Sequence, residues 1–544
     1  MNGATEMAVV DSIQPLLSVV LPAVLAILLY RYPSQRYRDV IASLGVVATL
    51  ILLLSMVPAL LDDRVHLFEP GELAPNINLT LEGDLFGLLF AVSVASVLLI
   101  TSVYSIWLVP ERPSDTTSYY QVCILAALSA GVGAGLAGNL LLLFIFLEVL
   151  TLVTYPLIAG GGGRRARRAG YTYLAYALGA GLLVLIGIRM VYAEVGTLAF
   201  TDDGIAELWS IAATEPLALQ LAFTLLVLGF GAKAGFVPIH SWLIRARRTE
   251  TPIFGAVLAV VVTTAGMFGI VRIYLHIFGS TGADILGMDP FLLAFAALTV
   301  VTGGLMAVGL EHLLDRLTYL TMVGSAVTVP LLLATVPDTS SVVLLYMLVH
   351  GVWLLLGFLI LHLVEIGHTD VSDDAFDRRP IGLGIVAVGI VTIAGLFGIL
   401  AGWYLLVDPI PDHRLLISTV IVINVLVHAL ALWPATIRLR KPTAVDIDCY
   451  PATTGWTVLD APVNSCRSMF ELLATTGERL GRVSMQSVRD PANAIETTLP
   501  DRLVPRYHHH RQRTLGSTGT KLGIVGSIYV LVLVLILVLL LGLW

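Results

Sequence analysis

The segment Gly229–Trp242, which reads GFGAKAGFVPIHSW, decides the fold class of this chain. It ends an apolar run of about 20 residues, the length that crosses a bilayer core of about 30 Å, and it places Lys233 inside that run. Three glycines flank the lysine and Pro238 follows one turn later, so the helix is expected to break there. Broken backbone at membrane depth is tolerated only where it is buried in protein or lines a watery cavity. The segment therefore predicts a membrane-spanning helix bundle with a polar interior.

The composition of the whole chain agrees with this interpretation. Of its 544 residues, 57% are hydrophobic and 13% are charged, whereas a soluble domain is about half apolar and about a quarter charged. Long apolar runs favour helices over a closed barrel, because each helix satisfies its own backbone polar groups. The sequence predicts an all-α polytopic membrane protein of about 14 transmembrane helices, the first of them retained rather than cleaved as a signal peptide. The predicted spans are 11–30, 39–61, 84–109, 118–136, 139–159, 169–193, 217–240, 252–278, 290–310, 317–336, 340–366, 381–405, 413–436 and 521–543.

Arginine-rich and arginine-poor loops alternate between these spans. The loop at 194–216 has five acidic residues and no Lys or Arg. Because basic loops are retained in the cytoplasm, the loops after odd-numbered spans are expected inside and both termini outside a plasma membrane. The arginines of these odd loops are Arg31, Arg36, Arg38, Arg112, Arg164, Arg165, Arg167, Arg168, Arg245, Arg247, Arg248, Arg316, Arg378 and Arg379.

The remaining composition excludes several classes of function. The formal net charge of −7 does not suggest a nucleic-acid partner. The three cysteines, Cys123, Cys449 and Cys466, have no paired spacing, so neither a zinc or iron–sulfur site nor a disulfide framework is expected. No nucleotide or flavin motif is present, and we expect no bound cofactor and no metal site.

The pattern of apolar and polar segments divides the chain into four regions. Within the third region, residues 461–488 predict an amphipathic helix that lies on the cytoplasmic surface or against neighbouring spans. The regions are 1–83 (two helices and an extracellular loop), 84–440 (the core), 441–520 (a polar cytoplasmic segment) and 521–544 (a last transmembrane helix).

Ionisable residues at membrane depth are costly, and they mark candidate functional sites. In this chain they are Glu148 in the fifth span, Lys233 in the seventh, and His350 in the eleventh, with His362 and Glu365 closer to its end. Lys233 is one of three lysines in a chain with 28 arginines. An arginine keeps its proton, whereas a buried lysine can release one. Lys233 is therefore either a titratable group or a fixed structural cation, and Glu148 is its expected partner in both cases.

A second interrupted span suggests an internal repeat. The twelfth span contains Ala394–Gly398 followed by Gly402, and it lies five spans after the break near Lys233. Paired discontinuous helices in corresponding places are typical of inverted-repeat transporters. Small residues also serve close helix packing, so the spacing alone leaves both interpretations open. The expected inverted five-helix repeats are spans 4–8 and spans 9–13.

Residues 233–243, KAGFVPIHSWL, strongly resemble the signature of a family of antiporter-like subunits. This family occurs in respiratory complex I, membrane-bound hydrogenases and Mrp-type multisubunit cation/proton antiporters. Similar segments cover residues 85–405 and include Glu148 in helix five, 192–197 after helix six, 251–252 and 266–272 in helix eight, 315–319 before helix ten, and His350 in helix eleven. Residues 445–448 with Tyr450 are similar to a pattern in the A and D subunits of Mrp antiporters, which favours a D-type subunit.

The resemblance implies a proton relay and a central polar axis. The relay residues would be Glu148, Lys233, His240 and His350, with Glu148 modulating the lysine, and the central-axis candidates are Thr264, His362 and Glu365. Thr264 departs from the family, which usually has Lys or His at that position. Gly402 and Leu354 also stand where the family often has a titratable residue, and Phe397–Gly398 replaces a pair of prolines. The first half of the path keeps its charged pair, whereas the centre and the far exit have lost titratable groups.

We expect a membrane subunit of a multisubunit monovalent cation/proton antiporter, similar to the Mrp D-type subunit, with no catalysis of its own. Its expected partners are other membrane subunits, protons, Na⁺ or K⁺, and the lipid bilayer. One alternative is a proton-translocating subunit of a complex I-like (NADH-quinone oxidoreductase) or hydrogenase-like redox pump. Another is a degenerate scaffold that transports nothing, although an idle buried ion pair would contribute little stability.

Overall fold

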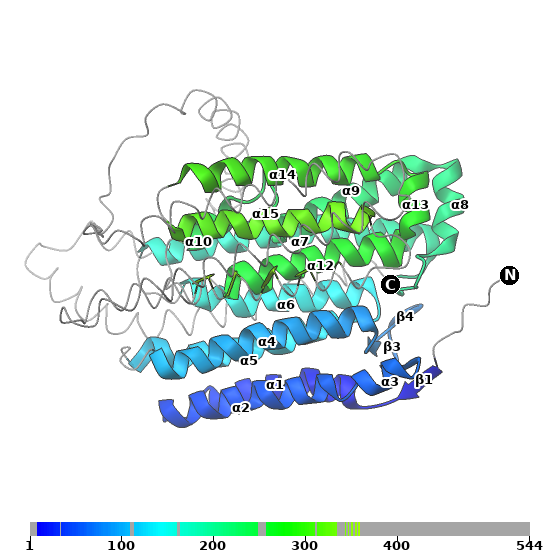
Figure 1. The fold of residues 1–544 in the computed structure, drawn as a ribbon. Helices are drawn as coiled ribbons and strands as arrows, with labels where there is room; N and C mark the ends of the chain where they lie inside the picture. Colours follow the sequence, from blue (N-terminus) through cyan, green and yellow to red (C-terminus); the bar gives the residue numbers. More distant parts are fainter. Residues whose placement is uncertain are drawn as a thin grey trace, which may run out of the picture. The chain divides into compact units, whose positions relative to one another are not determined.

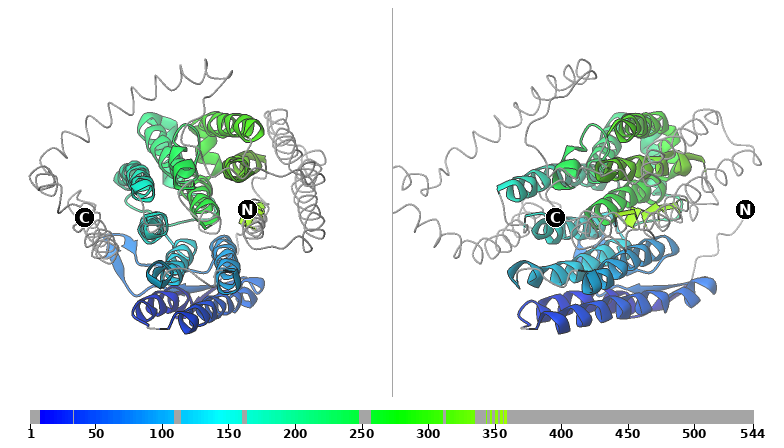
Figure 2. Two further views of the ribbon diagram at one scale, coloured as in Figure 1. Left: turned by 90° about the vertical axis from the view of Figure 1, so that its left-hand side faces the viewer. Right: turned by 60° about the vertical axis from the view of Figure 1, so that its left-hand side comes forward.

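The computed structural model describes residues 8–32, 34–108, 114–159, 164–247, 257–310 and 313–334, and nine single positions between 343 and 358. In this part of the chain, long helices run side by side in a bundle (Figure 1). Seen along the helix axes, α1 and α2 form one edge of the described bundle (Figure 2). Both pack against α5, and α2 also packs against α4.

The helices are predominantly apolar, as hydrophobic spans require. They are α1 (Gln14–Leu29), α2 (Gln35–Leu54), α3 (Val57–Leu61), α4 (Leu85–Leu108), α5 (Ser114–Gly135), α6 (Leu140–Ala159), α7 (Arg164–Val195), α8 (Ala206–Thr214), α9 (Pro216–Lys233), α10 (Ser241–Arg247), α12 (Thr263–Arg272), α13 (Gly279–Ile285), α14 (Asp289–Gly309) and α15 (Leu313–Ala334), with the π-helical segments η1 (Leu258–Val262) and η2 (Ile273–Phe278) on either side of α12.

Each of the first ten predicted spans coincides with helical structure. Among the described residues, eight helices are long and apolar enough to cross a bilayer, and two shorter apolar helices, Gln14–Leu29 and Tyr120–Gly135, match the first and fourth spans. All nine described positions of the eleventh span are helical. The protein is therefore a mostly helical, multi-pass membrane protein. Spans twelve to fourteen, most of the second repeat and the 441–520 segment lie outside the described residues, so the total of 14 helices and the repeats stay predictions.

The helix that carries Lys233 ends at that residue. Gly235 adopts a φ of +79°, in the left-handed region that glycine enters without steric penalty. The chain then turns, with the amide of Phe236 donating to the carbonyl of Gly231 over 2.8 Å, and resumes as a helix at Ser241. The predicted break thus leaves the lysine on the last turn of α9.

The eighth predicted span is less regular than its apolar pattern indicated. A five-residue π-helix precedes α12, and a six-residue π-helix follows it. Each π segment inserts an extra residue per turn, and such segments are frequent at functional sites. A single sequence does not distinguish them from α-helix, because this span is buried on nearly all sides and no exposed face marks the shift in the helix.

Short β-strands correct the prediction of an all-α fold. β1 (Ala8–Asp11) pairs in parallel with β2 (Arg64–Phe68), which pairs antiparallel with β5 (Leu81–Glu82). A separate hairpin joins β3 (Glu72–Ala74) to β4 (Ile77–Asn78). Most of these strands lie in the loop between the second and third predicted spans, where the ladders satisfy backbone groups that no helix pairs.

The two ends of the described bundle differ in charge. The strands, α8 and α13 share one end, and α10 lies at the other (Figure 1). The acidic 194–216 loop is fastened to the strand-bearing end, since the amide of Ile205 donates to the carbonyl of Ile277 over 2.8 Å. It also contains the helix α8, which the sequence did not predict. Arg245 and Arg247 lie on α10, so the structure separates the acidic and the arginine-rich loops as the alternation of loops requires.

Candidate functional site

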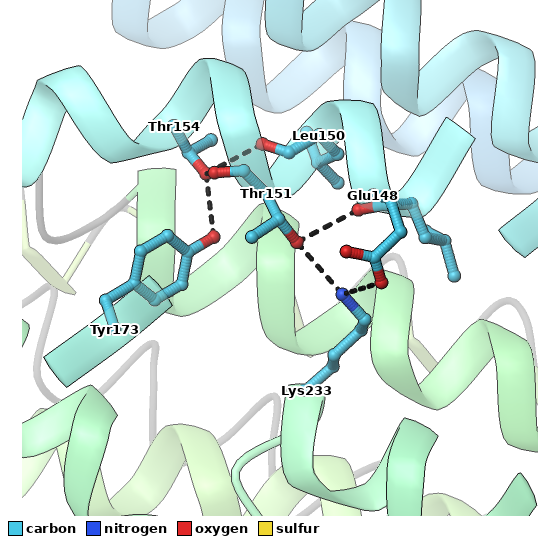
Figure 3. Close-up of polar contacts among 7 residues, drawn as sticks. Glu148, Leu150, Thr151, Thr154, Tyr173 and Lys233 are labelled. Carbon is cyan, nitrogen blue, oxygen red and sulfur yellow. Dashed lines mark hydrogen bonds and ion pairs between the residues drawn. The ribbon is translucent and has the colours of Figure 1, made fainter. Parts of the chain in front are cut away.

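Lys233 and Glu148 form a buried ion pair between α9 and α6 (Figure 3). Nζ of Lys233 lies 3.0 Å from Oε1 of Glu148, and each side chain is only 4% exposed. At this separation and an effective dielectric constant of about 20, the attraction is about 5.5 kcal/mol. The break in the α9 helix places the ammonium group opposite the middle of α6, so two residues 85 positions apart in sequence share one site.

The carboxylate of Glu148 has one described polar partner, the ammonium group of Lys233. Apart from the ion pair, neither of its oxygens accepts a hydrogen bond from the described residues. Gly181 of α7 leaves the space that the carboxylate occupies, because a Cβ atom at that position would lie 2.9 Å from Cδ of Glu148 and still closer to Oε1. The ion pair and the absence of a side chain at Gly181 therefore determine where the carboxylate lies.

Thr151 provides the second described contact of the ammonium group. Nζ of Lys233 donates to Oγ1 of Thr151 over 2.9 Å, and that hydroxyl donates to the carbonyl of Leu147 over 3.0 Å. Thr151 is 2% exposed and lies one turn beyond Glu148 on the same helix. Lys233 is thus held between a carboxylate and a hydroxyl on one face of α6.

A second pair of hydroxyls lies next to Thr151 (Figure 3). Oγ1 of Thr154 is 2.8 Å from the hydroxyl of Tyr173 on α7. The ring of Tyr173 packs on Trp242 of α10, with centroids 5.2 Å apart, and the indole of Trp242 donates to the carbonyl of Ala232 over 2.8 Å. The hydroxyl pair is therefore held in place by the same broken helix that positions Lys233.

Glycines on α12 allow a close approach to the break. A Cβ atom on Gly266 would lie 2.7 Å from the carbonyl oxygen of Phe230 and 2.8 Å from the carbonyl carbon of Lys233. Both atoms belong to the backbone and cannot easily move aside. Thr264, the predicted central-axis residue, lies two positions before Gly266 on α12, and α12 is a helix that packs against α9.

The other predicted site residues are more widely distributed. His240 precedes α10, and its ring lies 6.3 Å from that of Tyr319 on α15, centroid to centroid. His350 stacks on Tyr346 with a centroid distance of 5.7 Å, and its ring fills the space beside Gly324 of α15. The structure thus brings both histidines to α15. His362 and Glu365 lie outside the described residues, and Thr264 is half-buried on α12.

A second ion pair, between a buried arginine and a partly buried aspartate, was not identified as a site from the sequence. Arg272, at the end of α12, donates to both carboxylate oxygens of Asp84 over 2.8 and 2.7 Å. Its guanidinium also lies 4.9 Å from the ring centre of Phe200. Burial, together with the charge of Asp84, raises the pKa of the neighbouring Glu82 to about 7. The sequence feature that could have identified Arg272 as a candidate site residue is its position as an ionisable residue within an apolar span.

Curated relatives connect the chain to two kinds of complex. It is 29% identical over 303 residues to the D subunit of a probable K⁺/H⁺ antiporter of Rhizobium meliloti, covering 53% of this chain and 54% of that one. It is 28% identical over 262 residues to an NAD(P)H-quinone oxidoreductase chain 4 of a Synechococcus species, covering 47% of each chain. The D subunit of a Na⁺/H⁺ antiporter of Bacillus subtilis is 24% identical over 395 residues, or 71% of this chain and 77% of that one. The chain therefore spans about half the length of the first two relatives and three quarters of the third.

Solved structures share the fold. A chain of the Mrp complex from a Dietzia species superimposes with a TM-score of 0.60 at 19% identity, covering 77% of this chain and 80% of that one. A chain of respiratory complex I from Thermus thermophilus gives a TM-score of 0.62 at 19% identity, covering 78% of this chain and 88% of that one.

The profile of the family described as "NADH:quinone oxidoreductase/Mrp antiporter, TM" matches residues 137–425, which is more than half of the chain. This protein therefore belongs to the transmembrane family shared by NADH:quinone oxidoreductases and Mrp antiporters.

Proposed function

We propose that this chain is the proton-translocating membrane subunit of a multisubunit monovalent cation/proton antiporter, similar to the Mrp D-type subunit. The observation that carries the proposal is the Glu148–Lys233 ion pair. Both side chains are buried, and the lysine lies at a break in a membrane helix. A structural tie between two apolar helices would gain little from such a pair, because desolvating the two charges offsets most of their attraction. A group that must take up and release a proton needs this kind of setting.

The mechanism follows from the distance between Glu148 and Lys233. With the carboxylate 3.0 Å away, its attraction for the ammonium form of Lys233 is about 5.5 kcal/mol at an effective dielectric constant of about 20. When the carboxylate moves away, that stabilisation falls and the lysine releases its proton. Movement of Glu148 thus loads and unloads Lys233.

The proton relay continues from Lys233 past His240 to His350 along α15, which both histidines contact. The arginine-rich end of the bundle, marked by α10, faces the cytoplasm of a plasma membrane, and both termini lie outside. Other membrane subunits complete the complex and couple the proton to Na⁺ or K⁺, the two cations that the names of the relatives contain. The loss of titratable residues at Thr264 and Gly402 supports an exit through hydroxyls and water or through a neighbouring subunit.

A second candidate function is a proton-translocating subunit of a quinone-linked redox pump. It is favoured by the 28% identity to an NAD(P)H-quinone oxidoreductase chain and by the fold shared with complex I. Affinity purification of the tagged chain from its native membrane separates the two candidates. Co-purification of small membrane subunits without redox centres supports the antiporter, whereas iron–sulfur subunits would support the redox pump.

The experiment that tests the antiporter proposal measures cation-driven proton exchange in everted vesicles that contain the whole complex. Lys233→Ala is expected to abolish exchange while the complex still assembles, and Glu148→Gln is expected to reduce it at least tenfold. Normal exchange by the assembled Lys233→Ala complex would overturn the proposal. Loss of assembly in both variants, with exchange retained by the residual complex, would favour a scaffold.

A further inference from the structure

We propose that Thr299 of α14 is a positioning residue for Lys233, because its hydroxyl holds the backbone at the break between α9 and α10. The amide of Val237 donates to Oγ1 of Thr299 over 3.1 Å. Thr299 is 0% exposed and Val237 is 8% exposed, so the hydrogen bond lies in the protein interior. The proposal rests on the proposed function, since the position of the lysine relative to Glu148 matters for transport only if Lys233 transfers a proton.

The end of α9 is closed by its own backbone. Gly235 has a φ of +79°, and its amide donates to the carbonyl of Ala232 over 3.2 Å. The next amide, that of Phe236, donates to the carbonyl of Gly231 over 2.8 Å. Two such bonds around a left-handed glycine form the Schellman motif, which ends many helices. Val237 is the first residue beyond this motif, and its amide takes its acceptor from another helix.

The hydroxyl of Thr299 is oriented as an acceptor for this amide. It donates its own proton to the carbonyl of Phe295, one turn earlier on α14, over 3.0 Å, which leaves the lone pairs of the oxygen for Val237. The ring of Phe295 packs on that of Phe236, with centroids 5.1 Å apart. It also lies so close to Gly231 that a Cβ atom there would be 2.6 Å away. α14 therefore contacts the break at two successive turns, once with a ring and once with a hydroxyl.

Removing the hydroxyl would disturb the position of Lys233. A buried amide without an acceptor is costly, so the segment is expected to shift until the amide of Val237 finds water or another carbonyl. Lys233 is the last residue of α9, four positions before Val237, and such a shift reaches its turn. If the distance from Nζ to Oε1 of Glu148 grows from 3.0 Å to about 3.3 Å, the affinity of the lysine for its proton falls about 2.3-fold at an effective dielectric constant of about 20.

The test measures the pH dependence of cation-driven proton exchange in everted vesicles that contain the full complex. Thr299→Val keeps the shape of the side chain and removes the acceptor. We expect normal assembly and a maximal rate reduced at least about threefold, because small misplacements of reacting groups slow a reaction. The acidic limb of the profile should move to lower pH by about 0.4 unit, since a less strongly paired ammonium releases its proton more readily. An unchanged rate and profile would overturn the proposal, and so would a lower rate with an unchanged profile, which indicates a structural role.

The matched control is Thr328→Val on α15. Thr328 is 1% exposed, and its hydroxyl has no hydrogen-bond partner among the described residues. The same chemical change in an equally buried site should therefore leave both the rate and the pH profile at wild-type values.

A second pair of variants decides the question if Thr299→Val does not assemble. Thr299→Ser and Thr299→Ala both lose the methyl group and differ in the oxygen. Wild-type exchange with serine and the shifted profile with alanine would support the proposal, whereas equal profiles would contradict it. Failure of both valine and alanine to assemble, with normal serine, would show that the hydroxyl serves the fold and would also overturn it.

Lys233→Ala in the same vesicles separates this proposal from the proposed function. An inactive Lys233→Ala together with a wild-type profile for Thr299→Val removes the positioning role alone. An active Lys233→Ala removes the proposed function, and the positioning role with it.

Discussion

A single methyl group at position 181 should weaken the ion pair without unfolding the protein. A Cβ atom on Gly181 would meet the carboxylate of Glu148, which is the mobile end of a flexible side chain. We expect the carboxylate to move aside in Gly181→Ala while the helices stay in place. If its distance from Nζ of Lys233 grows from 3.0 Å to about 5 Å, the attraction falls from about 5.5 to about 3.3 kcal/mol at an effective dielectric constant of about 20. The loss of about 2 kcal/mol corresponds to about a 30-fold change in an equilibrium that the pair controls.

The matched control is Gly179→Ala, two positions earlier on the same helix. A Cβ atom at position 179 would meet nothing within 4 Å. Both substitutions replace glycine by alanine inside α7 and gain up to about 1 kcal/mol of helix propensity. The assay is the initial rate of cation-driven proton exchange in everted vesicles, normalised to the amount of assembled complex. We expect wild-type exchange for Gly179→Ala and at least a tenfold loss for Gly181→Ala. Equal rates would refute the argument that the position of the carboxylate controls the lysine.

Three further predictions concern other parts of the described chain. Thr264→Lys should be tolerated, with normal yield of the complex, if this half-buried position on α12 borders a hydrated path; aggregation would show that it packs in a dry core. Arg272→Met should lower the unfolding free energy by about 3–5 kcal/mol, because it leaves the Asp84 carboxylate without its partner. Adding Asp84→Asn should recover part of that loss, and thermal melting of the detergent-solubilised complex measures both. Glu82 has a pKa raised to about 7 by burial and by Asp84, so its contribution to stability is complete below about pH 4.5 and is lost as the pH rises through 7. Glu82→Gln should flatten this pH dependence of the melting temperature, and an unchanged slope would contradict it.

The sequence was most informative in the apolar spans, where ionisable residues are rare. Lys233 and Glu148 were predicted as partners because ionisable residues are uncommon in apolar spans, and the structure places them 3.0 Å apart. The break after Lys233 was equally predictable, since three glycines and a proline lie within the ten residues 229–238. The approximate positions of the first ten spans, though not their limits, followed from hydrophobic length.

Features that depend on contacts between helices were not predictable. Gly181 is one of several glycines in α7, and only the distance to Glu148 distinguishes it from Gly179. Tyr173 is likewise one of three tyrosines near the start of α7, and the sequence does not tell which of them faces α6. The β-strands at 64–82 and the helix α8 were missed because short elements in polar loops lack a periodic pattern long enough to detect.

The most direct test of the central claim replaces Lys233 by arginine. Arginine keeps the positive charge beside Glu148 but does not release its proton at physiological pH. The claim that Lys233 transfers a proton predicts that Lys233→Arg assembles at the wild-type level and loses exchange as completely as Lys233→Ala. Wild-type exchange by Lys233→Arg would show that only a fixed charge is needed at this position, and it would contradict the account.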